Sequence, residues 1–116
     1  MSSKKPLYAP VTSWNGIFFT SGQLPIDPET KKASDDFKEQ VRQSLANVLN
    51  IIEIEGGNKE KIIKMNIFLS DINNFSAMNE VYEEFFEGVN CPSRTALEVG
   101  NIPTGAMVEI EAIFHV

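Results

Sequence analysis

The sequence predicts a single α+β domain spanning residues 1–116, in which two helices pack on one face of a mixed β-sheet. A chain of 116 residues has the length of one domain, and no internal repeat, low-complexity block or linker divides it. Two segments carry apolar residues at helical spacing, and five others have the composition and periodicity of strands. Their order along the chain is β-β-α-β-α-β-β, which is typical of two helices packed against one sheet.

The first two strands are predicted at residues 7–11 and 17–21. They form a hairpin around an Asn-Gly pair at residues 15–16, which favours tight hairpin turns. Residues 17–19 are apolar at successive positions, so we expect both faces of this strand to be covered. Two prolines and an Asp-Pro step make residues 22–30 irregular.

The first helix is predicted to begin at Ser34, whose hydroxyl suits an N-cap. Asp35 and Asp36 then lie near the positive end of the helix dipole. The helix ends at the glycine pair of residues 56–57. Its apolar residues, at helical spacing, are Phe37, Val41, Leu45, Val48, Leu49 and Ile52.

The remaining elements are a strand at residues 62–69, a helix at 74–86, and strands at 95–99 and 107–116. The strand at 62–69 alternates, and one of its faces is predicted to hold Ile63, Met65, Ile67 and Leu69. The second helix is predicted to place Asn79 on its surface. Its apolar stripe comprises Phe75, Met78, Val81, Tyr82 and Phe85.

The last strand predicts a partner subunit. One of its faces is uniformly apolar and comprises Val108, Ile110, Ala112 and Phe114. The opposite face mixes apolar and charged residues and comprises Met107, Glu109, Glu111, Ile113 and His115. Two helices can cover only one face of a sheet of this size. A second face that is still partly apolar indicates that another subunit covers it, and we expect an oligomer.

Composition argues against several classes of protein. Ten basic and sixteen acidic residues give a net charge of −6, and the lysines are dispersed, so no nucleic-acid partner is expected. The single cysteine, Cys91, and the single histidine, His115, cannot form an intrachain disulfide or a metal site with the usual number of ligands. No apolar run approaches the length of a membrane span, so we expect a cytoplasmic protein without a membrane partner.

Arg94 is the first candidate for a functional residue. It is one of two arginines and follows Pro92 at the start of a predicted strand, where Glu98 is the only other charged residue nearby. A guanidinium carries a planar fork of donors that fits a carboxylate with two hydrogen bonds. The setting therefore indicates a site for a small anion. A structural ion pair with one of the acidic residues is an equally good interpretation at this stage.

Five segments together resemble a known family. They are Thr20-Ser21-Gly22-Gln23-Leu24-Pro25, Gln43-Ser44-Leu45-Ala46-Asn47-Val48, Tyr82-Glu83-Glu84-Phe85-Phe86, Pro92-Ser93-Arg94 and Glu109-Ile110-Glu111-Ala112. In this order they resemble the RidA/YjgF family of small trimeric proteins, along nearly the whole chain. The resemblance implies a chorismate-mutase-like (ferredoxin-like) fold. It also implies a homotrimer with a central barrel and clefts between subunits.

The resemblance further implies an activity. Members of this family act as 2-iminobutanoate/2-iminopropanoate deaminases, which hydrolyse reactive 2-imino acids to 2-keto acids and ammonia without a metal or organic cofactor. By the same resemblance, Arg94 holds the substrate carboxylate and Glu109 positions or activates the water. Tyr8 reaches into the cleft of a neighbouring subunit, and Ser21 lines the pocket. Ala96 stands where many members have a cysteine, and contributes its backbone carbonyl.

Each of these residues also has a structural interpretation. Glu109 could form an interface ion pair with a lysine, Tyr8 could fill the edge of the sheet, and Ser21 could be a turn residue. Two other functions also follow from the resemblance or from the site. Some relatives are described as RNA-directed translation inhibitors or endoribonucleases, and the cleft could instead be a non-catalytic binding site for small carboxylates.

Overall fold

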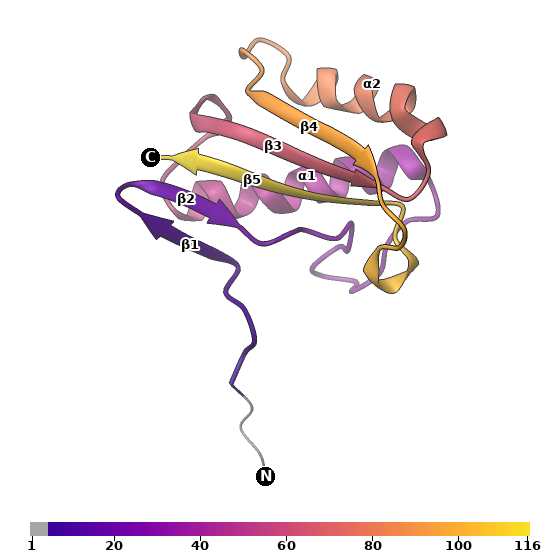
Figure 1. The fold of residues 1–116 in the computed structure, drawn as a ribbon, viewed down its shortest axis with the longest axis horizontal. Helices are drawn as coiled ribbons and strands as arrows, with labels where there is room; N and C mark the ends of the chain where they lie inside the picture. Colours follow the sequence, from indigo (N-terminus) through magenta and orange to yellow (C-terminus); the bar gives the residue numbers. More distant parts are fainter. Residues whose placement is uncertain (1–4) are drawn as a thin grey trace.

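The computed structural model describes residues 5–116 and contains five strands and two long helices (Figure 1). The strands are β1 (Val11–Trp14), β2 (Ile17–Thr20), β3 (Ile62–Leu69), β4 (Ser93–Glu98) and β5 (Val108–His115). The helices are α1 (Phe37–Ile54) and α2 (Phe75–Phe85). Three short 3-10 turns complete the chain, at Lys59–Lys61, Ile72–Asn74 and Pro103–Gly105. Within residues 5–116, no helix combines the length and the apolar character needed to cross a membrane.

The sheet is mixed, and its spatial order is β1-β2-β5-β3-β4. Only the pair β3–β4 is parallel, and the other three pairs are antiparallel. Both helices contribute to one buried cluster with the strands, and α1 lies behind the sheet in Figure 1. The predicted α+β fold, with two helices on one face of a mixed sheet, is confirmed.

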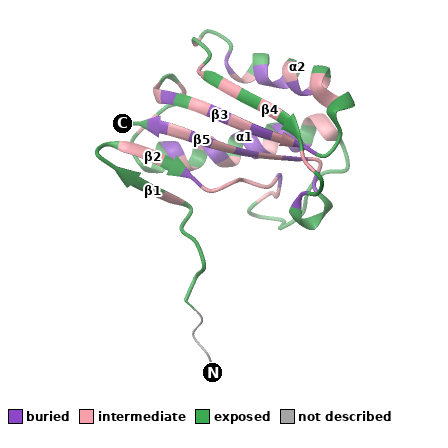
Figure 2. Cartoon of the chain, in the orientation of Figure 1, coloured by how far each residue is buried: buried purple, intermediate pink, exposed green. Residues whose placement is uncertain are grey.

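The two faces of the sheet differ in the way that the sequence pattern of the last strand predicted. Along β5, buried residues alternate with half-buried ones (Figure 2). The buried face packs on the helices and contains Val108, Ile110, Ala112 and Phe114 with Met65, Ile67 and Leu69 of β3. We call the other face the open face, and it contains Phe19, Asn66, Phe68, Leu97, Glu109, Glu111 and Ile113. Phe19 and Leu97 are 43% and 40% exposed there, so the single chain leaves apolar surface in contact with solvent.

The N-terminal hairpin differs from the prediction at its start. The turn is at the predicted Asn15 and Gly16, which both have positive φ, of 50° and 81°. However, β1 begins at Val11 and not at residue 7, because β2 has only four residues to pair with and the register ends at Val11 opposite Thr20. The chain before β1 runs away from the sheet (Figure 1).

The first helix begins two residues later than predicted. The N-cap of α1 is Asp36, whose carboxylate accepts a hydrogen bond from the backbone N–H of Glu39. Ser34 lies outside the helix, and its hydroxyl accepts a hydrogen bond from the N–H of Asp36 at 3.0 Å. Several capping residues in succession made the position of the cap ambiguous in the sequence, and the aspartate provides it.

A β-bulge changes which residues at the start of β3 face the core, relative to the prediction. The pairing of β3 with β5 shifts register between Ile62 and Lys64, so strict alternation is lost at Ile63. Ile62 is therefore the residue that joins the core, at 7% exposure, whereas Ile63 is 41% exposed. The prediction was correct for Met65, Ile67 and Leu69 and wrong for Ile63. The last two strands are shorter or shifted by one or two residues relative to the predicted ranges.

Candidate functional site

Arg94 lies in the seam between β4 and α2. It is opposite Met65 in the parallel pair β3–β4, and Met65 is fully buried, so Arg94 points to the helix side of the sheet. Its guanidinium lies over the ring of Tyr82, with Cζ 4.7 Å from the ring centroid, and 5.5 Å from the centroid of Phe75. Its Nη1 donates a hydrogen bond to Oδ1 of Asn79 at 2.7 Å. We call these four residues the Arg94 cluster.

The guanidinium has no carboxylate partner within residues 5–116. The salt bridges in this part of the chain join Lys38 to Glu80 and Arg42 to Glu39 and Glu84. The structural ion pair that the sequence left open is therefore not formed among the described residues. A guanidinium has five N–H donors, and the hydrogen bonds of Arg94 both use Nη1, which donates to Oδ1 of Asn79 and, more weakly, to Sδ of Met78 at 3.9 Å. The Nε and Nη2 donors have no partner within residues 5–116 and can bind an anion.

Tyr82 makes the surroundings of Arg94 apolar on one side. The residue is buried, and its hydroxyl has no hydrogen-bond partner among the described residues. Burial raises the pKa of Tyr82 to about 12, and the positive charge of Arg94 acts in the opposite direction. The phenol therefore remains neutral at physiological pH, and its ring supports the cation without neutralising it.

Glu109 lies on the open face of the sheet. It is opposite Phe68 in the antiparallel pair β3–β5, and the next open-face residue of β5 is Glu111, which accepts a hydrogen bond from Nδ2 of Asn66 at 3.1 Å. Partial burial, and secondly the nearby charge of Glu111, raise the pKa of Glu109 above its ordinary value. No lysine pairs with Glu109 within residues 5–116, and an ion pair across an interface between subunits stays an open alternative.

Ser21 connects Glu109 to the N-terminal segment. The side chain of Glu109 lies against the backbone of Gly22, the residue that follows Ser21. Ser21 donates from Oγ to the carbonyl of Ala9 at 2.7 Å and from its backbone N–H to the carbonyl of Pro10 at 2.9 Å. These two bonds hold the segment that carries Tyr8. The place of Ser21 in the lining of a pocket stays a prediction.

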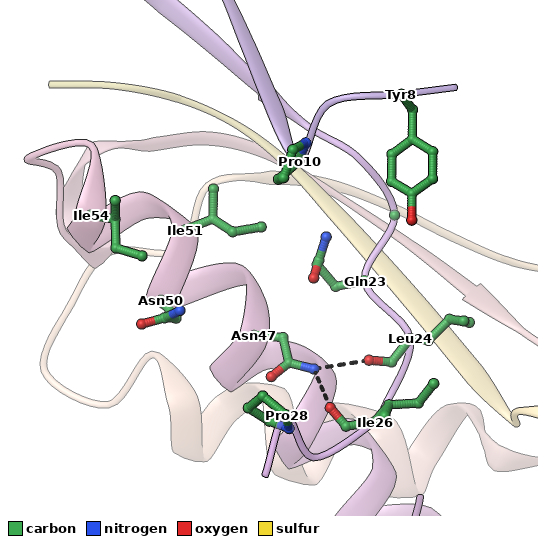
Figure 3. Close-up of a pocket in the computed structure, with 11 residues that line it drawn as sticks. Tyr8, Pro10, Gln23, Leu24, Ile26, Pro28, Asn47, Asn50, Ile51 and Ile54 are labelled. Carbon is green, nitrogen blue, oxygen red and sulfur yellow. Dashed lines mark hydrogen bonds between the residues drawn. The ribbon is translucent and has the colours of Figure 1, made fainter. Parts of the chain in front are cut away.

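Tyr8 is 73% exposed and lines a groove of about 470 Å³ beside α1. Figure 3 shows this groove, with Tyr8 and Gln23 on one side and Ile51 of α1 on the other. The ring of Tyr8 does not fill the edge of the sheet, because β1 begins three residues later. An exposed aromatic side chain on an extended segment is free to reach a neighbouring molecule.

The structure therefore brings the predicted site residues together as two separate groups. Arg94 and Ala96 are opposite Met65 and Ile67, on the helix side of the sheet. Glu109 is opposite Phe68, on the open face. Successive residues of a strand point to opposite faces, so the two groups cannot form one pocket within a single chain.

Asn79 is the residue that the sequence reasoning missed. It was predicted to be helix surface, yet it is half-buried and holds the arginine in place. Phe75 was assigned to the core, and it also flanks the guanidinium. The signal in the sequence was a polar amide directly after Met78, a residue of the apolar stripe. Spacing alone could not show that Arg94 packs against this amide.

Comparisons with known proteins match the chain over nearly all of its length. The family model for endoribonuclease L-PSP matches residues 3–116. A 2-iminobutanoate/2-iminopropanoate deaminase of Salmonella typhimurium is 41% identical over 99 residues, which cover 84% of this chain and 77% of the relative. A RutC family protein of Pyrococcus horikoshii is 40% identical over 117 residues, which cover 98% of this chain and 92% of the relative.

Solved structures agree with these relatives. The crystal structure of TdcF from Escherichia coli with bound serine superimposes with a TM-score of 0.91 at 36% identity, covering 98% of this chain and 91% of that one. The YjgF gene product of the same organism has a TM-score of 0.90, also at 36% identity, with coverage of 93% and 87%. By sequence and by fold, the chain belongs to the RidA/YjgF family, also called the endoribonuclease L-PSP family.

Proposed function

We propose that this protein is an imine deaminase that hydrolyses reactive 2-imino acids, such as 2-iminobutanoate and 2-iminopropanoate, to 2-keto acids and ammonia. The observation that carries the proposal is the Arg94 guanidinium, which is held by Asn79 and two aromatic rings and has no carboxylate partner within residues 5–116. Such a group is preorganised for the carboxylate of a small acid. A relative at 41% identity carries the name of this activity.

The site is proposed to form between subunits of a homotrimer. Arg94 and Glu109 point to opposite faces of the sheet, so a pocket that uses both needs two chains. The open face supplies the surface for assembly, because it exposes Phe19 and Leu97 beside half-buried Phe68 and Ile113. In this arrangement the open faces line a central barrel, and Tyr8 enters the cleft of a neighbour.

The proposed hydrolysis uses the guanidinium of Arg94 and the carboxylate of Glu109. Arg94 binds the substrate carboxylate through two N–H donors, and the backbone carbonyl of Ala96 lies on the same strand, two residues further along. Glu109 orients a water molecule, whose oxygen adds to the electrophilic imine carbon while the C=N π bond breaks onto nitrogen. The nitrogen takes the first proton lost by the added water, which gives a tetrahedral carbinolamine. It takes the second proton, from the remaining hydroxyl, as the C–N bond breaks, ammonia leaves and the C=O bond of the 2-keto acid forms. A carboxyl with a raised pKa can exchange protons closer to neutral pH than an ordinary glutamate.

The bound serine in the structure of TdcF supports this class of ligand. That protein holds a small amino acid, and its chain superimposes on this one over 98% of the present sequence. A 2-imino acid has the same carboxylate next to a nitrogen-bearing carbon. The comparison supports the proposal that the pocket of this protein accepts small 2-amino-acid-like substrates.

The direct test supplies freshly generated 2-iminobutanoate and measures keto-acid formation above the spontaneous rate. Wild-type protein is expected to accelerate the reaction, and Arg94→Ala and Glu109→Ala are each expected to abolish most of the acceleration. If wild-type protein adds nothing to the spontaneous rate, the deaminase proposal is wrong. Binding of 2-ketobutanoate without turnover would instead support a non-catalytic carboxylate site. RNA cleavage that survives Arg94→Ala in a nuclease-free preparation would support the RNA-directed function.

The assembly has its own test. Multi-angle light scattering of the purified protein should give three times the 12.9 kDa mass of the chain. Mixing Arg94→Ala with Glu109→Ala protein, after unfolding and refolding them together, should restore part of the activity, because mixed trimers contain some clefts with both residues intact. A monomer in solution, or mixed trimers without any recovery, would contradict a shared cleft.

A further inference from the structure

Gly22 lies where the side chain of Glu109 passes the Ser21–Gln23 segment. A Cβ atom placed on Gly22 would lie 2.9 Å from Cδ and 3.1 Å from Cγ of Glu109, and it would also overlap the Oε2 atom. These are the three nearest atoms to that position, and all of them belong to Glu109. The carboxylate therefore occupies the space that any side chain at residue 22 would need.

The backbone of this segment is fixed on both sides of Gly22. On one side, Ser21 is bonded to the carbonyls of Ala9 and Pro10. On the other, Gln23 donates to the carbonyl of Ile110 at 2.7 Å and accepts from its N–H at 3.2 Å. Ile110 is the residue next to Glu109, so the segment and the carboxylate are tied to the same part of β5. The segment cannot easily move away to accommodate a larger residue.

The glycine is not required by the conformation of the backbone. Gly22 does not belong to the glycines with positive φ, which are Gly16, Gly56, Gly88 and Gly105. Its φ therefore lies outside the left-handed range that disfavours alanine. The three atoms nearest to such a methyl group all belong to the side chain of Glu109, which can rotate away. At Gly57, by contrast, a Cβ would press on Ile52 and on backbone carbonyls of Ile52 and His115.

We propose that Gly22 is a positioning residue for Glu109: the missing side chain lets the carboxylate lie against the backbone of the segment that also holds Tyr8 and Ser21. This inference rests on the proposed function, in which Glu109 orients the attacking water. A methyl group at residue 22 would leave the fold intact and turn the carboxylate toward solvent. The reaction would then lose the geometry of the water and keep the binding of the substrate carboxylate by Arg94.

The charged groups that share the surroundings of Glu109 do not change with this substitution. Glu111 follows on β5 and is held by Asn66, and Lys64 lies on the same face of β3 opposite Ile113. Among the residues from Tyr8 to Gln23, the phenol of Tyr8 is the only titratable group. A change in the titration of Glu109 on introducing a methyl group therefore reports the position of its own carboxylate.

The test compares Gly22→Ala with Gly100→Ala. Gly100 also lies outside the positive-φ glycines, and a Cβ there would meet no atom within 4 Å, which makes it a matched control. In the imine assay, we expect Gly22→Ala to lower kcat by about tenfold to a hundredfold, because a displacement of about 1 Å can cost that much. KM should change by less than about threefold, since Arg94 still binds the substrate carboxylate. Gly100→Ala should match the wild type.

A double-mutant comparison shows whether Gly22 acts through Glu109. If it does, adding Gly22→Ala to a Glu109→Gln protein should cause no further loss of kcat. A full additional loss in the Glu109→Gln background would overturn the inference.

A measurement independent of activity separates this inference from the proposed function. A 13C NMR titration of the Glu109 carboxyl should show a lower pKa in Gly22→Ala than in the wild type, because the displaced carboxylate regains water. If the wild type has no deaminase activity but the titration shifts, the positioning role stands and the proposed function fails. An unchanged Glu109 titration in a folded Gly22→Ala protein overturns the positioning role. If Gly22→Ala does not fold, the double variant Gly22→Ala/Glu109→Ala must fold, because it lacks the Glu109 side chain that the new methyl group would meet. A double variant that also fails to fold overturns the inference.

Discussion

The side chains of Arg94 and Asn79 are joined by a hydrogen bond of 2.7 Å between Nη1 and Oδ1. The bond links the edge strand β4 to helix α2 and fixes the guanidinium above the ring of Tyr82. A neutral amide can hold an arginine in this way without cancelling its charge. A carboxylate at the same place would occupy the donors that an anionic ligand needs.

Replacing Asn79 tests this relationship. We expect Asn79→Ala to raise KM for a 2-imino acid by about tenfold, because one hydrogen bond to a charged group is lost. Asn79→Asp should raise KM further, because the new carboxylate competes with the substrate for Arg94. Steady-state kinetics of the imine assay measures both, and Asn50→Ala, an exposed asparagine on α1, is the matched control. An Asn79→Asp protein with wild-type KM would contradict this role.

The arginine itself is expected not to tolerate lysine. Arg94→Lys keeps the charge but loses the planar fork and its contact with the two rings, so we expect kcat/KM to fall by about tenfold to a hundredfold. Arg42→Lys is the control, since Arg42 is the only other arginine and binds Glu39 and Glu84 on the surface of the helices. Equal activity of Arg94→Lys and wild-type protein would show that a point charge is sufficient.

The buried hydroxyl of Tyr82 is expected to cost stability. It has no hydrogen-bond partner within residues 5–116, so Tyr82→Phe removes an unsatisfied group and keeps the ring beneath Arg94. The free energy of unfolding should stay equal or rise by up to about 1 kcal/mol, measured by urea denaturation. A loss of more than about 1 kcal/mol would mean that the hydroxyl has a partner in the assembled protein.

The raised pKa of Glu109 predicts a pH-dependent effect of its replacement. The folded protein binds this proton more tightly than the unfolded chain, so the carboxyl favours folding below its ordinary pKa, and this contribution is lost as pH rises through the folded pKa. Glu109→Gln should therefore be more stable relative to wild type at pH 7 than at pH 4. The difference should be less than about 1 kcal/mol, because the group is partly exposed to solvent. Urea denaturation at the two pH values measures it, and the opposite order would contradict the raised pKa.

Asn47 is expected to hold the irregular segment before α1. Its Nδ2 donates to the carbonyls of Leu24 and Ile26, each at 3.0 Å (Figure 3). Asn47→Ala leaves both carbonyls without this donor, so we expect the free energy of unfolding to fall by about 1–3 kcal/mol. Thermal and urea denaturation measure the loss, and Asn50→Ala on the same helix should be close to neutral. A neutral Asn47→Ala would show that water replaces the amide.

Local periodicity explains why much of the fold could be predicted. Apolar residues at helical spacing located both helices, and alternation identified the buried face of β5 because neighbouring side chains of a strand point to opposite faces. The same alternation also predicted the second, partly apolar face of the sheet, which is the open face. The face of Ile63 was predicted wrongly, because a bulge interrupts the alternation there. The bulge depends on the pairing of β3 with β5, which lies about fifty residues away in sequence.

By itself, the sequence determined the elements, the two faces of the sheet, the family and the identity of the arginine and glutamate that the family resemblance selects. Only the tertiary structure decided that Asn79 and not a carboxylate holds Arg94, and that Gly22 leaves room for Glu109. It also decided that Arg94 and Glu109 point to opposite faces. The physical reason is that periodicity is set by neighbours along the chain, whereas a contact between distant residues depends on strand register and on how closely two backbones approach.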